Sequence, residues 1–272
     1  WLKVYEIPEC PRTSKGRQIQ NVIYMEPDDK IKTYLNVRDL RKSENVEGKF
    51  ITLVTKRGVI KKTAVENYTH PRTKGIFAID IREGDELLEA VLTNGSNEIM
   101  MAARAGRCVR FDESDVRAMG RTAAGVRGIS IEEDNEVVGV ITHDPSGDEG
   151  QSVLVVSEHG FGKRTDVEEY RLTSRGSKGV KTINITDKTG PLVAIKNVTE
   201  DNDLMIITEA GLVIRMHVSD IKLAGRATQG VKLINIRDND GIAAVCVVPR
   251  EEEEEEAPVQ TEAPAQVETE EK

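Results

Sequence analysis

The sequence predicts an all-β protein of the β-propeller class, followed by a disordered acidic tail. Three observations predict this fold: a strand-and-glycine pattern recurs four times, its period is close to 50 residues, and its apolar segments are short and rich in Val and Ile. Helical repeats of this period would need amphipathic runs of ten or more residues, whereas glycine interrupts these segments. Antiparallel units of this size bury their faces by stacking around an axis.

Each repeat opens with an apolar strand, a glycine and a second strand. These glycines are Gly58, Gly106, Gly160 and Gly211, separated by 48, 54 and 51 residues. A cation stands four residues after each glycine: Lys62, Arg110, Arg164 and Arg215. An apolar residue stands ten residues after it: Tyr68, Val116, Tyr170 and Ile221. Both positions hold in all four copies, so the pattern is a structural unit.

Each repeat continues into a loop in which an arginine precedes a second glycine by three or four residues. These loops are Arg72-Thr-Lys-Gly75, Arg121-Thr-Ala-Ala-Gly125, Arg175-Gly-Ser-Lys-Gly179 and Arg226-Ala-Thr-Gln-Gly230. An alternating strand and a further apolar strand follow, which completes a unit of four short strands. The last apolar strand, Ile242 to Val248, is a candidate to pair with strands at the amino terminus.

The opening repeat is incomplete. It supplies the loop Arg12-Thr-Ser-Lys-Gly16, but Trp1 stands where the other copies have their cation. We therefore expect the chain to begin inside the first blade of a longer polypeptide.

The charge divides sharply between body and tail. Residues 251–272 hold ten glutamates and one lysine, and subtracting these from totals of 47 acidic and 38 basic side chains leaves 37 of each in the body. The tail has too few large apolar groups to fold. We expect a propeller domain over 1–250 and a disordered tail over 251–272. The tail either keeps the end of the chain soluble or, as a polyanion, competes with DNA for a basic surface nearby.

Composition and motifs argue against membrane, metal and catalytic sites. No apolar run approaches the ~20 residues of a membrane span, so we expect a cytoplasmic protein. Cys10, Cys108 and Cys246 are widely separated, and the four histidines share no ligand spacing. No phosphate-binding loop is present. We predict no catalytic residue, no metal and no cofactor in this chain.

The recurring cations predict a surface for duplex DNA. Side chains that recur with the period of a propeller form a ring, and cations that neutralise phosphates bind DNA without regard to sequence by releasing counterions. The alternative is that a cation after a turn glycine keeps an outer strand soluble and protects a sheet edge. The predicted DNA-binding residues are Arg12, Lys15, Lys61, Lys62, Arg72, Lys74, Arg110, Arg121, Arg127, Lys163, Arg164, Arg175, Lys178, Arg215, Arg226 and Lys232.

Several motifs resemble the C-terminal domain of the DNA gyrase A subunit, in the same order and one set per blade. They include Gly58-Val-Ile-Lys-Lys-Thr63, Glu83-Gly-Asp-Glu-Leu87, Gly125-Val-Arg-Gly-Ile129, Gly160-Phe-Gly-Lys-Arg-Thr165 and Gly225-Arg-Ala-Thr-Gln-Gly-Val231. The resemblance covers residues 1–248. It implies a six-bladed, pinwheel-like propeller whose rim wraps double-stranded DNA for an ATP-dependent type II topoisomerase, an isomerase that introduces negative supercoils.

The same resemblance implies partners and one departure. The partners are gyrase B and the rest of the gyrase A polypeptide, in an A2B2 assembly in the bacterial cytoplasm and nucleoid, with ATP and magnesium used on other domains or subunits. The family's box, Gln-Arg-Arg-Gly-Gly-Lys-Gly, is not present in these 272 residues. We therefore expect DNA binding without a completed wrap. Two alternatives stay open: the DNA-bending propeller of topoisomerase IV, and a propeller that acts as a protein interaction scaffold.

Overall fold

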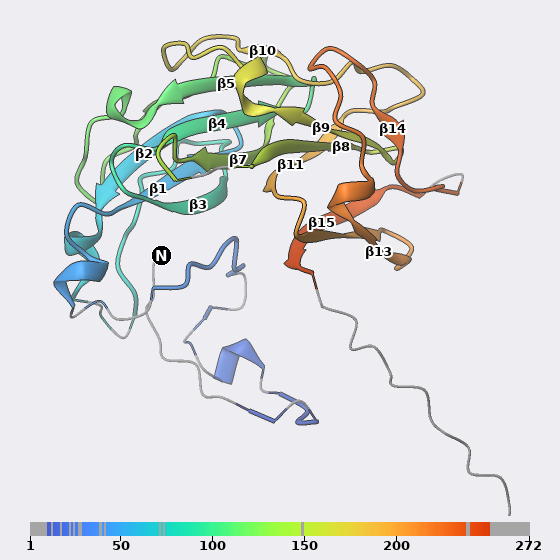
Figure 1. The fold of residues 1–272 in the computed structure, drawn as a ribbon. Helices are drawn as coiled ribbons and strands as arrows, with labels where there is room; N and C mark the ends of the chain where they lie inside the picture. The colour runs from blue at the N-terminus through green and yellow to red at the C-terminus, as the bar shows by residue number, and fades with distance from the viewer. Residues whose placement is uncertain are drawn as a thin grey trace, which may run out of the picture.

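The predicted all-β architecture is confirmed by a computed structural model, shown in Figure 1. The structure describes residues 10–250 apart from positions 12, 17, 22, 24, 27, 28, 38, 39, 41, 71, 73, 148, 149, 238 and 239. Within these residues every regular element is a β-strand or a short 3-10 helix. None of the described helices is long and apolar enough to cross a membrane.

Four antiparallel sheets make up the body of the molecule. The first contains β3 (Leu87–Thr93), β1 (Phe50–Thr55), β2 (Val59–Ala64) and β6 (Val126–Arg127), in that order. The second contains β7 (Val137–His143), β4 (Glu98–Ala103), β5 (Arg107–Asp112) and β10 (Val180–Lys181). The third contains β11 (Leu192–Val198), β8 (Ser152–Ser157), β9 (Phe161–Asp166) and β14 (Val231–Lys232). The fourth contains β15 (Ile242–Pro249), β12 (Asn202–Thr208) and β13 (Val213–His217).

The outermost strand of each of the first three sheets comes from the following repeat. β6 belongs to the second repeat but pairs with β2 of the first, with Ile60 opposite Val126. β10 and β14 pair in the same way with β5 and β9. Repeats two to four each supply four strands, as the sequence predicted, but the two-residue strand of each of these repeats pairs with the sheet of the preceding repeat. Because each exchange joins two sheets, neighbouring repeats cannot separate without breaking strand pairs.

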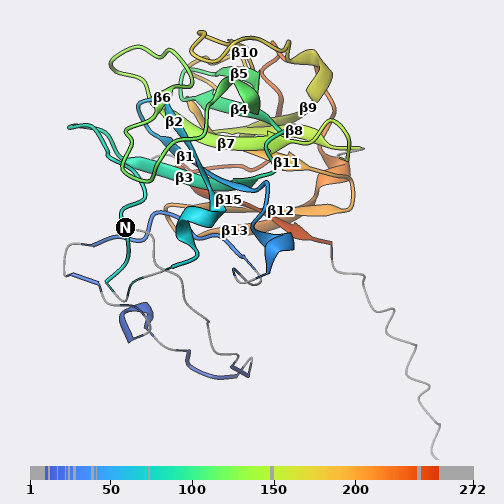
Figure 2. The same cartoon turned by 90° about the vertical axis from the view of Figure 1, so that its left-hand side faces the viewer.

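The core lies between successive sheets. Strands β3, β7, β11 and β15 contact one another in that order along the inner side, and Figure 2 shows β15, β12 and β13 of the fourth sheet below β1 and β3 of the first. One hydrophobic cluster joins Val54 and Ile60 of the first sheet to Ile99, Met101 and Phe111 of the second. All five are essentially inaccessible to solvent. Since burying a large apolar side chain contributes roughly 1.5–3 kcal/mol, these contacts hold the stack together.

Tight turns connect the strands. The first two strands of each repeat meet in a hairpin whose glycine has a positive φ, as at Gly106 with φ 76°. A single 3-10 turn then follows the second strand of each sheet, and further turns lie near the amino terminus. The 3-10 helices are η1 (Ile19–Asn21), η2 (Ser43–Asn45), η3 (Val65–Tyr68), η4 (Glu113–Asp115), η5 (Val167–Glu169) and η6 (Val218–Asp220).

The two ends of the chain lie partly outside the described residues. β15 pairs with β12 of its own sheet and is the last strand of that sheet, and its candidate pairing with the amino terminus stays a prediction because residues 1–9 lie outside the described residues. In the described part of residues 10–49 the structure contains 3-10 turns and no strand. Residues 1–9 of the opening repeat and the predicted acidic tail at residues 251–272 lie outside the described residues. The count of six blades stays a prediction.

Candidate nucleic-acid interface

Three of the cations that follow the hairpin glycines are buried. The exposed fractions of Lys62, Arg110 and Arg164 are 5%, 6% and 7%. Each reaches backbone carbonyls at the 3-10 turn of the next repeat, and the same three residues form isolated parallel bridges to that repeat. We call these residues the staple cations. They tie consecutive sheets together, so their charged groups are occupied by the protein.

Arg110 has the most extensive set of staple contacts. Its Nε donates to Glu98 Oε2 at 2.6 Å within the sheet. Its Nη1 donates to the carbonyl oxygens of Val167 and Tyr170 in the next repeat, both at 2.9 Å. Glu98 is itself buried, so the pair satisfies two charges that would otherwise be costly in the interior.

Lys61 and Lys163 are also buried and point their ammonium groups at loop carbonyls. Lys163 Nζ donates to the carbonyls of Gly225 and Arg226 at 2.5 and 2.6 Å. Lys61 Nζ donates to the carbonyl of Arg121 and to a second loop carbonyl. Burial, with a smaller contribution from nearby guanidinium groups, lowers the pKa of both lysines to about 8. These residues support the loops from beneath and are not available to a phosphate.

The loop arginines connect each loop to the one before it. Arg175 Nη1 donates to the carbonyl of Arg127 at 3.1 Å, and Arg226 Nη1 donates to the carbonyl of Lys181 at 2.8 Å. Arg121 makes the corresponding bond to the carbonyl of Phe77 at 3.2 Å. All three loop arginines are half-buried. They order the loops and leave part of each guanidinium at the surface.

Arg215, in the last sheet, is bound to an acid. Its Nε lies 2.7 Å from Asp203 Oδ2, while the other oxygen of Asp203 is 2.7 Å from His217 Nδ1. The hydrogen bond with His217 is the main reason that the pKa of Asp203 is lowered, and Arg215 adds to it. Arg215 is more exposed than the staple cations, but its charge is partly neutralised.

The other predicted residues present their charge to solvent. Lys15, Arg72, Lys74, Arg127, Lys178 and Lys232 are exposed, and Arg12 lies outside the described residues. Arg127 lies on β6 opposite Val59, and Lys232 lies on β14 opposite Phe161. Because β6 and β14 are the outermost strands of their sheets, these two cations lie at the outer edge of the molecule.

Four further exposed cations on the same edge were missed by the sequence prediction. Lys181 lies on β10 opposite Arg107. Arg117, Arg171 and Lys222 each follow the buried apolar residue ten positions after the hairpin glycine, and all are exposed. The signal was present, because a cation recurs eleven residues after three of the four glycines. We call the exposed set the outer-edge cations: Arg117, Arg127, Arg171, Lys181, Lys222 and Lys232.

The register of the strands gathers these cations into rows. Leu172, next to Arg171, bridges to β5, which also pairs with the strand that carries Lys181. In the same way Leu223, next to Lys222, bridges to β9, which pairs with the strand that carries Lys232. Each outer edge thus carries two exposed cations from one loop. Figure 1 shows β10 at the margin of the molecule, outside β5 and β4. The arrangement repeats exposed cations from sheet to sheet along one margin, with the exposed acids Asp115, Glu169 and Asp220 two residues before three of them. Such a row of cations is suited to a polyanion.

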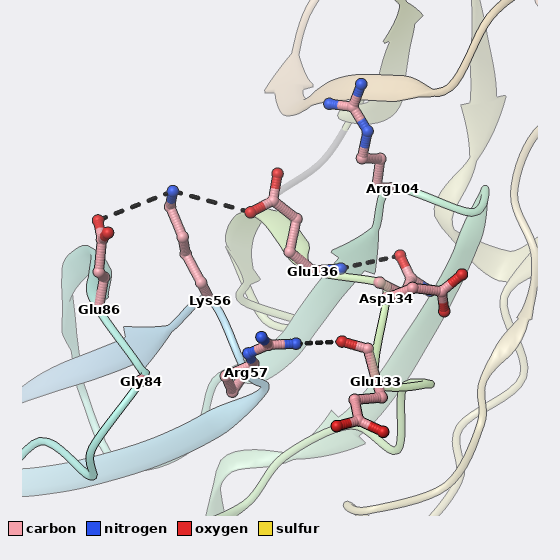
Figure 3. A pocket seen from close by; sticks show the side chains of 9 residues that line it. Lys56, Arg57, Gly84, Glu86, Arg104, Glu133, Asp134 and Glu136 are labelled. Atoms are coloured by element: carbon pink, nitrogen blue, oxygen red, sulfur yellow. Dashed lines mark hydrogen bonds and ion pairs between the residues drawn. The ribbon is translucent and has the colours of Figure 1, made fainter.

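A cavity of about 380 Å³ lies elsewhere, beside the hairpin turns. Figure 3 shows Lys56 between Glu86 and Glu136, at 3.7 Å from a carboxylate oxygen of each, and Arg57 next to Glu133. A hydrogen bond from Lys32 is the main cause of a lowered pKa at Glu86. Lys56 is therefore paired with two acids, whereas the Arg57 guanidinium donates to the backbone carbonyl of Glu133. Among the described residues no group of His, Cys, Asp and Glu is placed to hold a metal ion.

Comparison with known families supports the resemblance. The family described as "DNA gyrase C-terminal domain, beta-propeller" matches residues 1–33, 49–94, 97–144, 151–199 and 202–249, and these segments follow the repeats found in the sequence. The chain belongs to the DNA gyrase C-terminal domain family. The predicted resemblance and the propeller fold are thereby confirmed.

Individual relatives agree with this assignment. The chain is 45% identical over 255 residues to the DNA gyrase A protein of Staphylococcus aureus (strain NCTC 8325 / PS 47), an alignment that covers 93% of this chain and 28% of that protein. Its fold is similar to the crystal structure of the C-terminal domain of DNA topoisomerase IV (TM-score 0.77, 23% identity, 86% of this chain and 71% of the other). It is similar to the same degree to the DNA gyrase A C-terminal domain (TM-score 0.74, 23% identity, 85% and 75%). The fold alone does not separate these two relatives.

Proposed function

We propose that this gyrase C-terminal domain binds duplex DNA, without sequence preference, along its outer-edge cations and bends the duplex around the stacked sheets. One observation carries the proposal: six exposed cations recur along the outer edges of three successive sheets, three on the outermost strands and three beside residues that bridge to the next strand inward, while acids of the hairpin turns lie in a separate cavity. A path of phosphates can follow such a margin from sheet to sheet.

The electrostatics favour these six residues over the buried ones. A staple cation would have to leave its carbonyl and carboxylate partners before it could reach a phosphate. An exposed cation exchanges only water and counterions, and the release of those counterions is the source of its affinity. Bending a site of some tens of base pairs costs on the order of 1–6 kcal/mol, so several contacts must act together.

The proposal places the domain within a larger enzyme. The chain spans 28% of the length of the gyrase A proteins that it matches. We propose that it acts as the DNA-wrapping part of a gyrase A polypeptide, paired with gyrase B in an A2B2 assembly, in the bacterial cytoplasm and close to the nucleoid. In this assignment residues 1–250 form the propeller and residues 251–272 a flexible acidic tail. Strand passage and ATP hydrolysis belong to other parts of the assembly.

Binding of linear duplex DNA by the 272-residue chain, measured over a series of salt concentrations, tests the proposal. If six phosphate contacts form, the slope of log K against log salt is about −5, since each contact contributes about −0.9. Binding that is absent at low salt contradicts the proposal and favours a protein interaction scaffold.

A second candidate is supported by the likeness to the topoisomerase IV domain. A bending propeller of that type would bind DNA with a similar salt slope but would not constrain supercoils. Relaxing and resealing circular DNA in the presence of the chain separates the two: a change in linking number that grows with the amount of protein indicates wrapping, and an unchanged linking number indicates bending alone. The same assay with a variant that carries the Gln-Arg-Arg-Gly-Gly-Lys-Gly box tests whether that box completes the wrap.

A further inference from the structure

Two leucines are exposed at equivalent places on neighbouring outer edges. Leu172 and Leu223 each have an exposed fraction of 54%. Backbone hydrogen bonds fix the segments that carry them: Thr173 N donates to the carbonyl of Arg110, and Ala224 N to the carbonyl of Arg164, both at 2.9 Å. Their exposure is therefore a property of the folded edge, since the backbone on which they stand is paired with the staple strands.

Each leucine lies on an edge that also carries exposed cations. Along β5, Lys181 lies opposite Arg107 and Leu172 opposite Arg110, three residues further on. At about 3.3 Å per residue the two backbone positions are about 10 Å apart along the edge, and their odd spacing turns the two side chains to opposite faces of the sheet. An exposed cation, Arg171, directly precedes Leu172. The β9 edge repeats the order with Lys232, Lys222 and Leu223.

We propose that Leu172 and Leu223 pack against the deoxyribose of bound duplex DNA, between phosphates held by the neighbouring outer-edge cations. This inference rests on the proposed function and adds a component of binding that does not depend on salt. The charge pattern selects the occupant. An apolar protein surface would have to bury two cations beside each leucine without compensation, whereas a DNA strand alternates anionic phosphates with the C–H surface of its sugars.

The contact does not require insertion between base pairs. An apolar wedge inserted from the minor groove kinks the duplex toward its major groove. Such a kink bends the DNA away from the protein that carries the wedge, whereas the proposed function needs the DNA to bend around the protein. Packing on the sugars allows the duplex to curve toward the protein and is independent of sequence. The leucines accordingly increase the affinity for DNA and fix the distance between the sugar-phosphate backbone and the outer edge of the protein.

The test is the salt dependence of duplex binding for the double variant Leu172→Ala/Leu223→Ala in the full chain. Truncating a leucine removes part of the apolar area that it buries in the complex, and we expect about fivefold weaker binding per leucine, or about 25-fold for both. The slope of log K against log salt stays the same, because no phosphate contact is lost. The whole line shifts to weaker binding, at high salt as much as at low salt.

Two further variants provide matched controls. Ala118 occupies the equivalent position on the first sheet, bridged to Lys62, so Ala118→Leu should tighten binding about threefold without changing the slope. Ile81 is exposed by 40% and lies beside the acidic turn that ends at Glu86, and Ile81→Ala should leave binding unchanged. Thermal unfolding of each variant verifies that the fold is intact.

Three results would overturn the inference while leaving DNA binding by the unaltered chain in place. The first is an unchanged affinity of the double variant. The second is a smaller salt slope, which would mean that the leucines only position cations. The third is self-association of the unaltered chain that the double variant loses while its DNA binding stays the same, which would assign the leucines to a protein contact. If the unaltered chain itself fails to bind, the proposed function fails instead.

Discussion

Replacement of Arg110 by methionine tests whether the staple cations act in folding or in DNA binding. Arg110 and Glu98 have side-chain exposures of 7% and 10%, and their charged atoms are 2.6 Å apart. Removing the guanidinium leaves the Glu98 carboxylate buried without its partner and deprives two carbonyls of the next repeat of their donor. Breaking a buried pair in this way costs about 3–5 kcal/mol.

The loss is measured by urea and thermal unfolding of the full chain. For a domain of this size each kcal/mol lowers Tm by about 2–4 °C, so Arg110→Met should melt roughly 10 °C below the unaltered protein. Adding Glu98→Gln should recover part of the loss, because the orphaned charge is removed. The matched surface variant Arg171→Met should change the free energy of unfolding by less than about 0.5 kcal/mol.

DNA binding should distinguish the two arginine variants in the reverse way: the variant that loses stability keeps its salt slope, and the stable variant loses part of it. Where the protein is folded, Arg110→Met should bind duplex with an unchanged salt slope, while Arg171→Met should reduce the slope by about 0.9. The reasoning is refuted if Arg110→Met is as stable as the unaltered chain and binds DNA with a smaller slope. The same logic applies to reversing Arg110, Arg164 and Arg215 together, which we expect to unfold the chain rather than only weaken its DNA binding.

Three other predictions follow from single features. Gly179→Ala should destabilise the chain by about 1–3 kcal/mol in urea unfolding, because Gly179 has φ 65° and an added Cβ would lie 2.3 Å from the carbonyl oxygen of Cys108. The pKa values of Lys61 and Lys163 are lowered to about 8 in the folded chain, so between pH about 8 and about 10.5 the unfolded chain binds more protons than the folded one. The free energy of unfolding of the unaltered protein should therefore rise with pH over this range, relative to that of Lys61→Met/Lys163→Met. Deleting residues 251–272 should tighten duplex binding at low salt, because ten acids no longer compete for the outer edge.

Each of these has a control. Gly120 has no atom within 4 Å of an added Cβ, and Gly120→Ala should leave stability close to that of the unaltered chain; equal losses for both glycines would discard the close-approach argument. A stability difference between the lysine variants that is flat with pH would mean that these lysines stay fully charged when buried. Unchanged affinity after tail deletion would show that the tail does not reach the DNA surface.

The sequence was sufficient to predict the repeat and the fold, because hairpin glycines and apolar strands recur with a nearly constant period. It could not show which sheet receives the fourth strand. Val180 has the same place in its repeat whether it pairs within that repeat or with the preceding one. The exchange depends on close backbone approach at Gly179, and this is a three-dimensional property.

The sequence also located the cations without showing which way they point. Lys62 and Arg127 belong to one periodic pattern, yet the first is buried against Glu113 and the second is exposed on β6. What separates them is the position of carbonyl and carboxylate acceptors in the next repeat, which is set by packing. Arg171 was missed because a cation that follows a buried tyrosine was assigned no role, although it recurs as regularly as the staple cations.

The most direct test of the central claim is the salt slope of duplex binding after all outer-edge cations are replaced by glutamine. The replaced residues are Arg117, Arg127, Arg171, Lys181, Lys222 and Lys232. We predict that the slope falls by about 5, to near zero, while the unfolding transition is preserved. A variant that keeps its folded stability and binds DNA with the original slope would contradict the claim that this edge is the DNA surface.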